Sequence, residues 1–167
     1  MRSHKRNFKI GEMSILKKIM LILLIAFLAV QFIQPARNNN VQVLPADISK
    51  TVSVPENVHT ILKTACYDCH SNHTDYPWYS YLQPVGWILY NHITNGKTEL
   101  NFSEFGSYAT RRQQSKLKAI ATQIKDGEMP LFSYTIIHKN ARLSKDEKSI
   151  IINWAQNAKD SLDKINP

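Results

Sequence analysis

The sequence predicts an all-α domain preceded by an apolar N-terminal segment. Apolar residues recur at intervals of three and four along four separate stretches, and no stretch alternates apolar and polar residues as a half-buried strand does. The 167 residues are 43% hydrophobic and 10% aromatic, with only two cysteines. This composition is typical of one modest domain and excludes a disordered chain or a disulfide-rich scaffold.

The first segment, residues 1–18, is basic. It carries six Lys or Arg side chains against one Glu, and so contributes +5 to the formal net charge of +8. The remainder is only mildly basic, and we therefore expect no binding to nucleic acid.

The next segment, residues 19–35, is expected to enter a membrane. Its run Ile19–Ile33 has no charge and as a helix would measure about 22 Å, against about 30 Å for a bilayer core. No small-x-small cleavage site follows, which favours an uncleaved anchor over a signal segment. The basic residues before the run predict a cytoplasmic N-terminus, with everything after residue 35 on the other side of the membrane.

A polar stretch follows the apolar run. It contains Pro35 and Pro45 and lacks helical periodicity, so residues 36–52 are assigned to a linker. The folded domain is then expected to comprise residues 53–167.

Two helices are predicted in the first half of this domain. Ser53 and Glu56 have the spacing of a capping box, and the helical pattern that follows runs to Cys69. Pro84 opens the second helix, which the Asn-Gly pair at 95–96 is expected to end.

Two further helices are predicted in the second half. One runs from about Tyr108 to Asp126 and is closed by Gly127, and the other opens at the capping box formed by Ser144 and Glu147. The segments between the four helices, residues 71–83, 97–107 and 127–143, are expected to be long turns.

The sequence Cys66-Tyr67-Asp68-Cys69-His70 has the C-x-x-C-H form of a c-type haem attachment site. In a helical turn the two cysteines project from one face, so that their sulfurs can form thioethers with the two vinyl groups of one haem. His70 then lies where its ring can bind the iron as proximal ligand. The motif therefore predicts one covalent haem c held by Cys66, Cys69 and His70.

Two other sites could use these cysteines. A thioredoxin-like dithiol has the same spacing, but it belongs to a strand-helix-strand unit that this sequence does not predict. A structural zinc site could combine Cys66 and Cys69 with two histidines, chosen among His70, His73 and His92. A zinc site, however, does not require a histidine directly after the second cysteine.

The second axial ligand of the iron is expected to be Met129. It follows the glycine stop at Gly127 and precedes Pro130, in a loop that could present its thioether sulfur. His92, on the apolar face of the second helix, is the main rival. His73 and His138 are less suitable candidates by their positions in the sequence.

An aromatic cluster follows the motif and extends into the second predicted helix. Because a flat macrocycle needs broad apolar walls, we expect these side chains to pack in the haem pocket and the core. They are Tyr76, Trp78, Tyr79, Tyr81 and Trp87.

The order of C-x-x-C-H helix, Met-Pro loop and C-terminal helix resembles class I cytochromes c. The segments CYDCHSNHTDYPWYS, DGEMPLFSY, HKNARLS and NWAQNA also resemble a small haem-binding domain family of exported bacterial proteins. This resemblance implies a cytochrome c-like helical domain around one haem. It also implies that Cys66 and Cys69 hold the haem, with His70 as proximal and Met129 as distal ligand.

The sequence thus predicts a single-pass protein of the bacterial cytoplasmic membrane with a monohaem domain on the periplasmic side. We expect it to carry single electrons between redox partner proteins in the periplasm or membrane, and we find no constellation of catalytic residues. Alternatives are a peroxidase or a gas or redox sensor with an open sixth iron position, and a structural zinc module.

Overall fold

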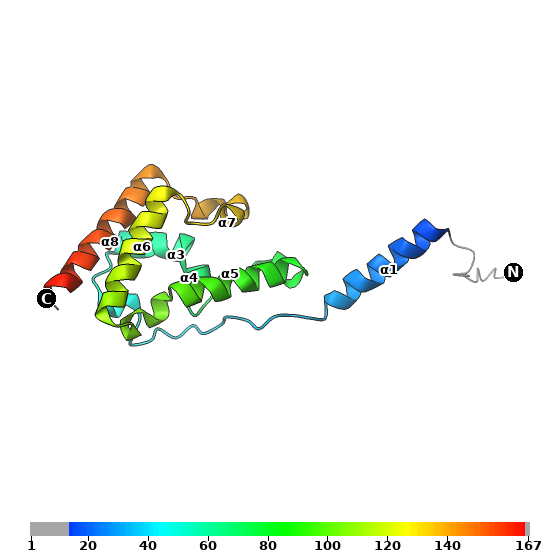
Figure 1. Cartoon of the computed structure of the whole chain (residues 1–167), viewed down its shortest axis with the longest axis horizontal. Helices are drawn as coiled ribbons and strands as arrows, with labels where there is room; N and C mark the ends of the chain where they lie inside the picture. The colour runs from blue at the N-terminus through cyan, green and yellow to red at the C-terminus, as the bar shows by residue number, and fades with distance from the viewer. Residues whose placement is uncertain (1–13, 166–167) are drawn as a thin grey trace, which may run out of the picture. The chain divides into compact units, whose positions relative to one another are not determined.

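A computed structural model describes residues 14–165 (Figure 1). The secondary structure in this range is helical, and no strand occurs there beyond an isolated bridge between Asn39 and His73. This confirms the all-α prediction. The α-helices are α1 (Ile15–Val30), α2 (Ile48–Thr51), α3 (Glu56–Ala65), α4 (Tyr67–His70), α5 (Val85–Glu99), α6 (Thr110–Asp126), α7 (Phe132–Ile137) and α8 (Lys145–Ile165). The 3-10 helices are η2 (Trp78–Tyr81), η3 (Phe102–Ser107) and η4 (Lys139–Ala141).

The described residues divide into two compact units. The larger unit comprises residues 37–76 and 90–165, and the smaller unit comprises residues 14–36 and 77–89. α5 begins in the smaller unit and ends in the larger one.

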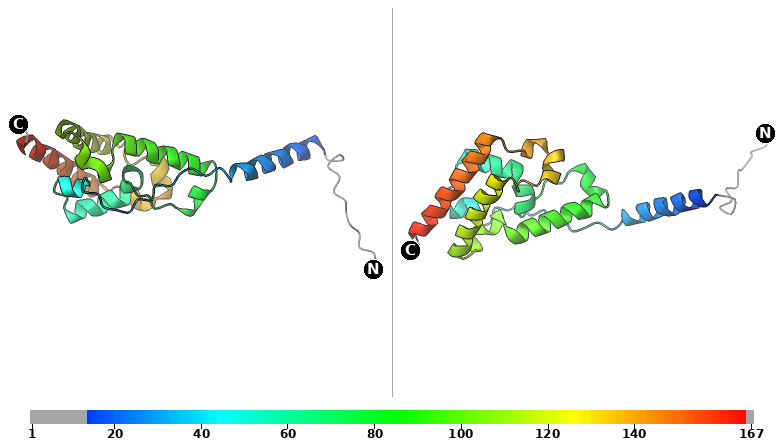
Figure 2. Two further views of the ribbon diagram at one scale, coloured as in Figure 1. Left: turned by 90° about the horizontal axis from the view of Figure 1, so that it is seen from below. Right: turned by 45° about the horizontal axis from the view of Figure 1, so that its top comes forward.

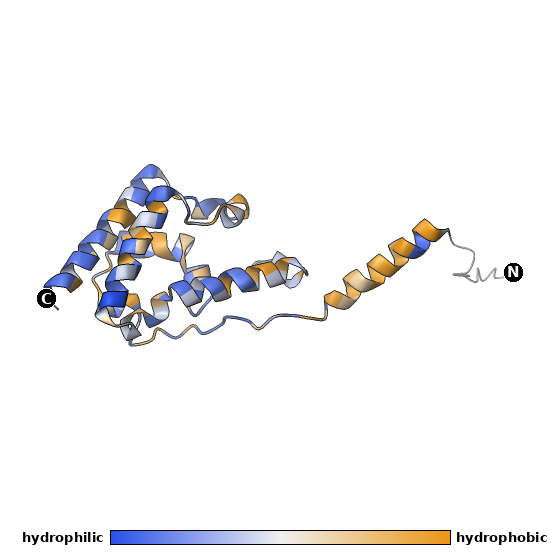
Figure 3. Cartoon of the chain, viewed as in Figure 1, coloured by the Kyte–Doolittle hydropathy of each residue, from blue (hydrophilic) through white to orange (hydrophobic). Residues whose placement is uncertain are grey.

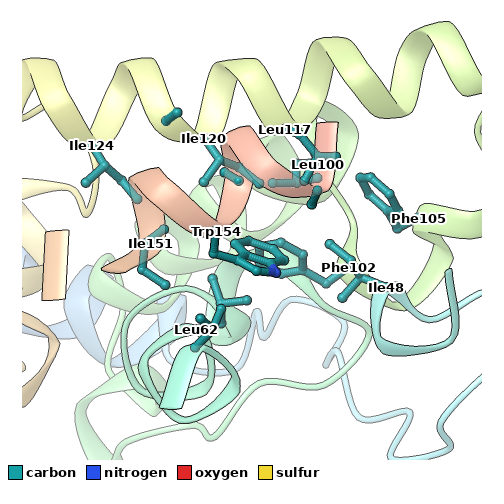
Figure 4. Packing of buried hydrophobic residues seen from close by; sticks show 14 of the residues in the cluster. Ile48, Leu62, Leu100, Phe102, Phe105, Leu117, Ile120, Ile124, Ile151 and Trp154 are labelled. Atoms are coloured by element: carbon teal, nitrogen blue, oxygen red, sulfur yellow. The ribbon is translucent and has the colours of Figure 1, made fainter. Parts of the chain in front are cut away.

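The core of the larger unit lies between α6 and α8, which run side by side in opposite directions (Figures 1 and 2). Leu117 and Ile120 from α6 face Trp154 from α8 in this core (Figure 4). The indole Nε1 of Trp154 donates a hydrogen bond to the Ser53 carbonyl at 2.9 Å. α8 is thereby joined to the chain just before α3.

The expected linker contributes to this core. Ile48 is completely buried, and Asp47 is buried and caps α2 by accepting a hydrogen bond from the Ser49 amide at 2.9 Å. Earlier in the linker, the Asn40 amide donates to the Asn72 carbonyl at 2.9 Å. Residues 37–52 are therefore part of the folded unit, and the core begins before Ser53.

The capping box predicted before α3 does not form. α3 starts at Glu56 after Pro55, and no side chain caps it. The helix also ends earlier than predicted, at Ala65, because the backbone of Cys66 leaves the helical region with φ −129° and ψ −39°. A separate short helix, α4, then carries the remainder of the C-x-x-C-H motif.

The predicted end of α6 and the predicted start of α8 are confirmed. Gly127 terminates α6 in the left-handed conformation, at φ 77°. Before α8, the Ser144 amide donates to the Glu147 carboxylate at 2.8 Å, and the Glu147 amide donates to the Ser144 hydroxyl at 3.2 Å. This is the reciprocal pattern of a capping box.

The predicted stop at residues 95–96 is wrong, because α5 continues through Gly96 to Glu99. The three expected turns also contain short helices. These are η2 in the first turn, η3 in the second, and α7 and η4 in the third.

The smaller unit contains α1, which includes most of the apolar run Ile19–Ile33. After Lys17 and Lys18 its side chains are apolar around the whole circumference (Figure 3), and none of them is buried. Within residues 14–165, no helix combines the length and the hydropathy needed to cross a bilayer. Most of the basic segment 1–18 lies outside the described residues.

The smaller unit also contains part of the aromatic cluster. Trp78 and Tyr81 are exposed, so these two side chains do not pack in the core of the protein. Both lie in the 3-10 helix η2, which buries Ser80 and leaves Trp78 and Tyr81 at the surface.

Candidate functional site

The C-x-x-C-H motif forms one helical turn. Cys66 is the C-cap residue of α3 and also the N-cap residue of α4. Its carbonyl accepts hydrogen bonds from the amides of Cys69 at 3.2 Å and His70 at 3.0 Å. Both cysteines are free thiols. The turn brings the three predicted haem-binding residues together on a short, hydrogen-bonded segment.

The imidazole of His70 is held by the backbone of α5 and the residue that follows it. Its Nδ1 lies 3.0 Å from both the Gly96 carbonyl and the Leu100 carbonyl. Since both partners are acceptors, Nδ1 carries the proton and Nε2 carries the lone pair. This is the arrangement that orients a histidine as a metal ligand through Nε2.

Burial keeps this ring neutral. It lowers the pKa of His70, and this effect outweighs the hydrogen bonds to Leu100 and Gly96, which favour the protonated form. A neutral imidazole is the form that can donate an electron pair to iron. The protonation state and the tautomer of His70 therefore both fit an axial haem ligand.

Gly96 allows α5 to approach the motif closely. A Cβ atom at this position would lie 2.7 Å from the Cys69 carbonyl oxygen and 3.3 Å from the Cys69 Cβ. Glycine is therefore needed in mid-helix for close approach, which explains why the Asn-Gly pair does not end α5. The same approach places the Gly96 carbonyl within reach of His70.

The two cysteines are half-buried and their thiols are neutral. Desolvation raises the pKa of Cys66 to about 12, with a smaller contribution from Cys69. Desolvation also raises the pKa of Cys69 to about 11, assisted by the charge of Asp68. A dithiol that acts as a nucleophile has a lowered pKa instead. These values do not fit the thioredoxin-like alternative.

Aromatic stacking fixes the motif to the core. The ring of Tyr67 stacks on Phe102 with centroids 5.1 Å apart and an interplanar angle of 16°. The His70 ring meets the same Phe102 edge-on at 6.2 Å. Phe102 is almost completely buried, so both neighbours of the cysteines rest on a rigid support.

Asp68, inside the motif, connects it to two later segments. Its carbonyl accepts a hydrogen bond from the Thr74 hydroxyl at 2.6 Å, and its Oδ1 accepts from the Asp75 amide at 3.0 Å. Its Oδ2 accepts from the Tyr134 hydroxyl at 2.6 Å. The last bond brings α7 to the motif from 66 residues further along the chain.

Met129 lies three residues before α7 and is half-buried. Its amide donates to the Gln123 carbonyl of α6 at 3.2 Å. The bond between Tyr134 and Asp68 joins the helix after Met129 to the C-x-x-C-H turn. α7, which begins three residues after Met129, is therefore held at the motif.

The three other histidines considered as iron ligands lie in three different places. His92 is half-buried on α5, one helical turn before Gly96. His73 lies 3.2 Å from Asp75 through its Nε2, and His138 stacks on Tyr134 with ring centroids 4.2 Å apart. Across residues 14–165, no three His, Cys, Asp or Glu side chains are grouped so that they could hold a metal ion.

The sequence pattern assigns no role in the site to Asp68, Gly96 or Tyr134. Gly96 carries a signal, a glycine in a helical pattern, but that signal by itself indicates a stop. Asp68 and Tyr134 carry none, because a pairing across 66 residues leaves no local pattern.

A protein-family model described as a haem-binding domain matches residues 25–157. This range includes the whole C-x-x-C-H turn, α5, Met129 and α7. No curated protein and no solved structure shows significant similarity to the chain.

Proposed function

We propose, from the premise that the chain belongs to the haem-binding domain family, that it is a membrane-anchored monohaem c-type cytochrome domain. In this proposal it transfers single electrons on the periplasmic side of the cytoplasmic membrane. One observation supports it most strongly. Two neutral thiols and a neutral His70 lie on one helical turn, and Nδ1 of His70 donates to two backbone carbonyls.

Cys66 and Cys69 would hold the group covalently. They lie in one helical turn, followed directly by His70. Thioether formation consumes both thiol protons without requiring a stable thiolate in the folded domain, so the raised pKa values are compatible with this role.

His70 would bind the iron through Nε2. The two carbonyls on Nδ1 set the direction of the ring and increase the basicity of Nε2, as outer-shell partners of metal-bound histidines do. When bound, the haem supplies a one-electron couple at its iron.

Met129 is the proposed distal ligand. The bond from Tyr134 to Asp68 supports this choice, because it fastens the helix after Met129 to the motif. His92 is less suitable. It belongs to α5, whose Gly96 carbonyl lies on the Nδ1 side of His70, whereas a distal ligand would have to come from the side that Nε2 faces.

The apolar helix α1 would anchor the domain. Its exposed apolar surface requires a covering partner, and a bilayer supplies one. The electron donors and acceptors would then be redox proteins of the periplasm or of the same membrane.

A staining experiment tests covalent binding. The full-length protein, expressed with haem-maturation machinery, should keep haem peroxidase staining at its own mass after denaturing electrophoresis. The variant Cys66→Ala,Cys69→Ala should lose this staining. If the parent loses its staining and both thiols can be alkylated, covalent attachment is wrong.

A spectrum tests the distal ligand. Ferric haem with a thioether ligand has a weak absorption band at the red end of the visible spectrum, which Met129→Ala should remove while the haem stays attached. His92→Ala is the matched control and should keep the band. A parent that is high spin and binds carbon monoxide would instead favour the sensor or peroxidase function.

A further inference from the structure

Residues 77–89 form an uncharged, aromatic segment with an exposed apolar surface. Its sequence, PWYSYLQPVGWIL, contains no Asp, Glu, Lys, Arg or His. The exposed fraction is 76% for Trp78, 56% for Tyr81 and 52% for Ile88. Leu82 and Val85 are exposed as well. Five large apolar side chains exposed within eleven residues indicate a surface that binds a partner.

Glutamine side chains join this segment to the C-terminal end of α1. The Gln83 amide donates to Gln31 Oε1 at 2.9 Å, and Gln31 Nε2 donates back to the Gln83 carbonyl at 3.3 Å. Gln34 accepts from Gln83 Nε2 at 3.1 Å and donates to the Tyr81 carbonyl at 3.0 Å. The two pieces of chain are 52 residues apart in sequence and form one compact unit.

Trp87 and Gly86 make further close contacts, both with the chain after α1 and within the segment. Trp87 Nε1 donates to the Ile33 carbonyl at 2.9 Å, and the Trp87 amide donates to Gln83 Oε1 at 3.1 Å. Gly86 packs so closely that a Cβ atom there would lie 2.5 Å from the Ser80 carbonyl. Buried Gln83 thus organises the segment, and the apolar side chains are left on its surface.

The position of the segment favours a lipid bilayer as the partner. It is bonded to the end of α1, the helix whose apolar side chains are exposed on all sides. The 16 residues of α1 span about 24 Å, less than the roughly 30 Å of a bilayer core. Trp and Tyr side chains are enriched where membrane helices leave the hydrocarbon and enter the headgroup layer.

We propose that residues 77–89 lie in the lipid headgroup layer and rest on the bilayer where α1 leaves it. The proposal depends on the membrane anchoring proposed above. Because the segment has no charge, binding depends on apolar burial and is insensitive to salt. The bilayer contact would then include two segments distant in sequence, which would fix the orientation of the start of α5.

Photolabelling tests this placement on the full-length protein. The protein is reconstituted into vesicles of phosphatidylethanolamine and phosphatidylglycerol with a trace of phospholipid that carries a photoreactive acyl chain, and labelled peptides are mapped by mass spectrometry. We expect label in α1 and in residues 77–89. The control is α7, whose Phe132 is 75% exposed but which belongs to the other compact unit; label there should be at least fivefold lower.

A variant pair sharpens the test. Trp78→Ser,Tyr81→Ser,Ile88→Ser should lower the label in residues 77–89 at least fivefold and leave the label in α1 unchanged. Trp78→Phe,Tyr81→Phe,Ile88→Leu should retain it. Haem content and far-ultraviolet circular dichroism check that both variants fold.

The outcomes separate the two proposals. If α1 is labelled and residues 77–89 are labelled no more than α7, the headgroup placement is wrong and the anchor stands. If α1 itself is not labelled, the anchor is wrong and the headgroup placement is wrong with it. Neither result bears on covalent haem, which staining measures separately.

Discussion

Gly96 and Gly127 each follow a stretch of helical periodicity, but they act in opposite ways. Gly127 ends α6 with φ 77°, and the amide after it bonds the Gln123 carbonyl at 2.9 Å. Gly96 stays inside α5, which continues to Glu99. The local sequence around the two glycines predicts the same event, and only one of them produces it.

The difference lies in what surrounds each glycine. A Cβ atom at residue 127 would meet no atom within 4 Å, whereas at residue 96 it would lie 2.7 Å from the Cys69 carbonyl. At Gly127 the conformational freedom of glycine is used, and at Gly96 its small size. The second use depends on a neighbour that is distant in sequence.

The largest expected effect comes from Gly96→Val. Overpacking costs about 1–3 kcal/mol in a folded interior, and at this position the Cβ meets a backbone carbonyl of the motif itself. We expect a loss of stability near the upper end of this range and a reduction of covalent haem by several fold. Urea denaturation and haem staining per mole of protein measure the two effects.

The variant Gly96→Ala gives a sharper comparison. In a free helix this change is favourable by about 1 kcal/mol, so a net loss of stability in the protein would isolate the cost of the close approach. If Gly96→Ala stabilises the domain, α5 does not approach Cys69 tightly, and close packing is not the reason that residue 96 is a glycine.

A smaller effect is expected for Gly127→Ala. The left-handed conformation costs a residue with a side chain about 1–2 kcal/mol, and no clash adds to this cost. Haem content should stay at the parental level, because the change acts on the end of α6 alone. Gly127→Asn should recover part of the loss, since Asn tolerates this conformation better than Ala. Urea denaturation midpoints of both variants check this order.

The same contrast explains how much the sequence can predict. Features set by neighbouring residues are predictable. They include the all-α class, the end of α6 at Gly127 and the capping box of α8. The grouping of Cys66, Cys69 and His70 follows from their spacing alone and is seen in the structure.

Features set by tertiary contacts are not predictable in this way. The hydrogen bonds from His70 to Gly96 and Leu100 span 26 and 30 residues, and that from Tyr134 to Asp68 spans 66. The polar surroundings of Ile48 predict a linker, although its own side chain is completely buried in the core. Only the folded chain shows these pairings.

The two capping boxes repeat the contrast on a smaller scale. Ser144→Ala should cost about 1 kcal/mol, because it removes the acceptor for the Glu147 amide. Ser53→Ala should cost little, since its side chain caps no helix and its carbonyl, which accepts from Trp154, is retained. Denaturation of the two variants side by side checks the difference. Equal losses would mean that the box before α3 forms in solution.

The smallest expected effect is the pH dependence of the box that forms. Hydrogen bonds from the backbone and side chain of Ser144 lower the pKa of Glu147 in the folded state. A lowered carboxyl pKa stabilises the fold above the pKa of the unfolded chain, and this stability is lost as the pH falls through the folded-state pKa. Because Glu147 is near the surface, the contribution should be below about 1 kcal/mol.

We therefore expect Glu147→Gln to be slightly less stable than the parent at neutral pH, and the difference in stability to disappear as the pH is lowered toward about 2. Ser53→Ala, measured over the same range, is the control and should track the parent throughout. A gap for Glu147→Gln that stays constant with pH would show that the carboxylate charge contributes nothing and that only the shape of the side chain matters.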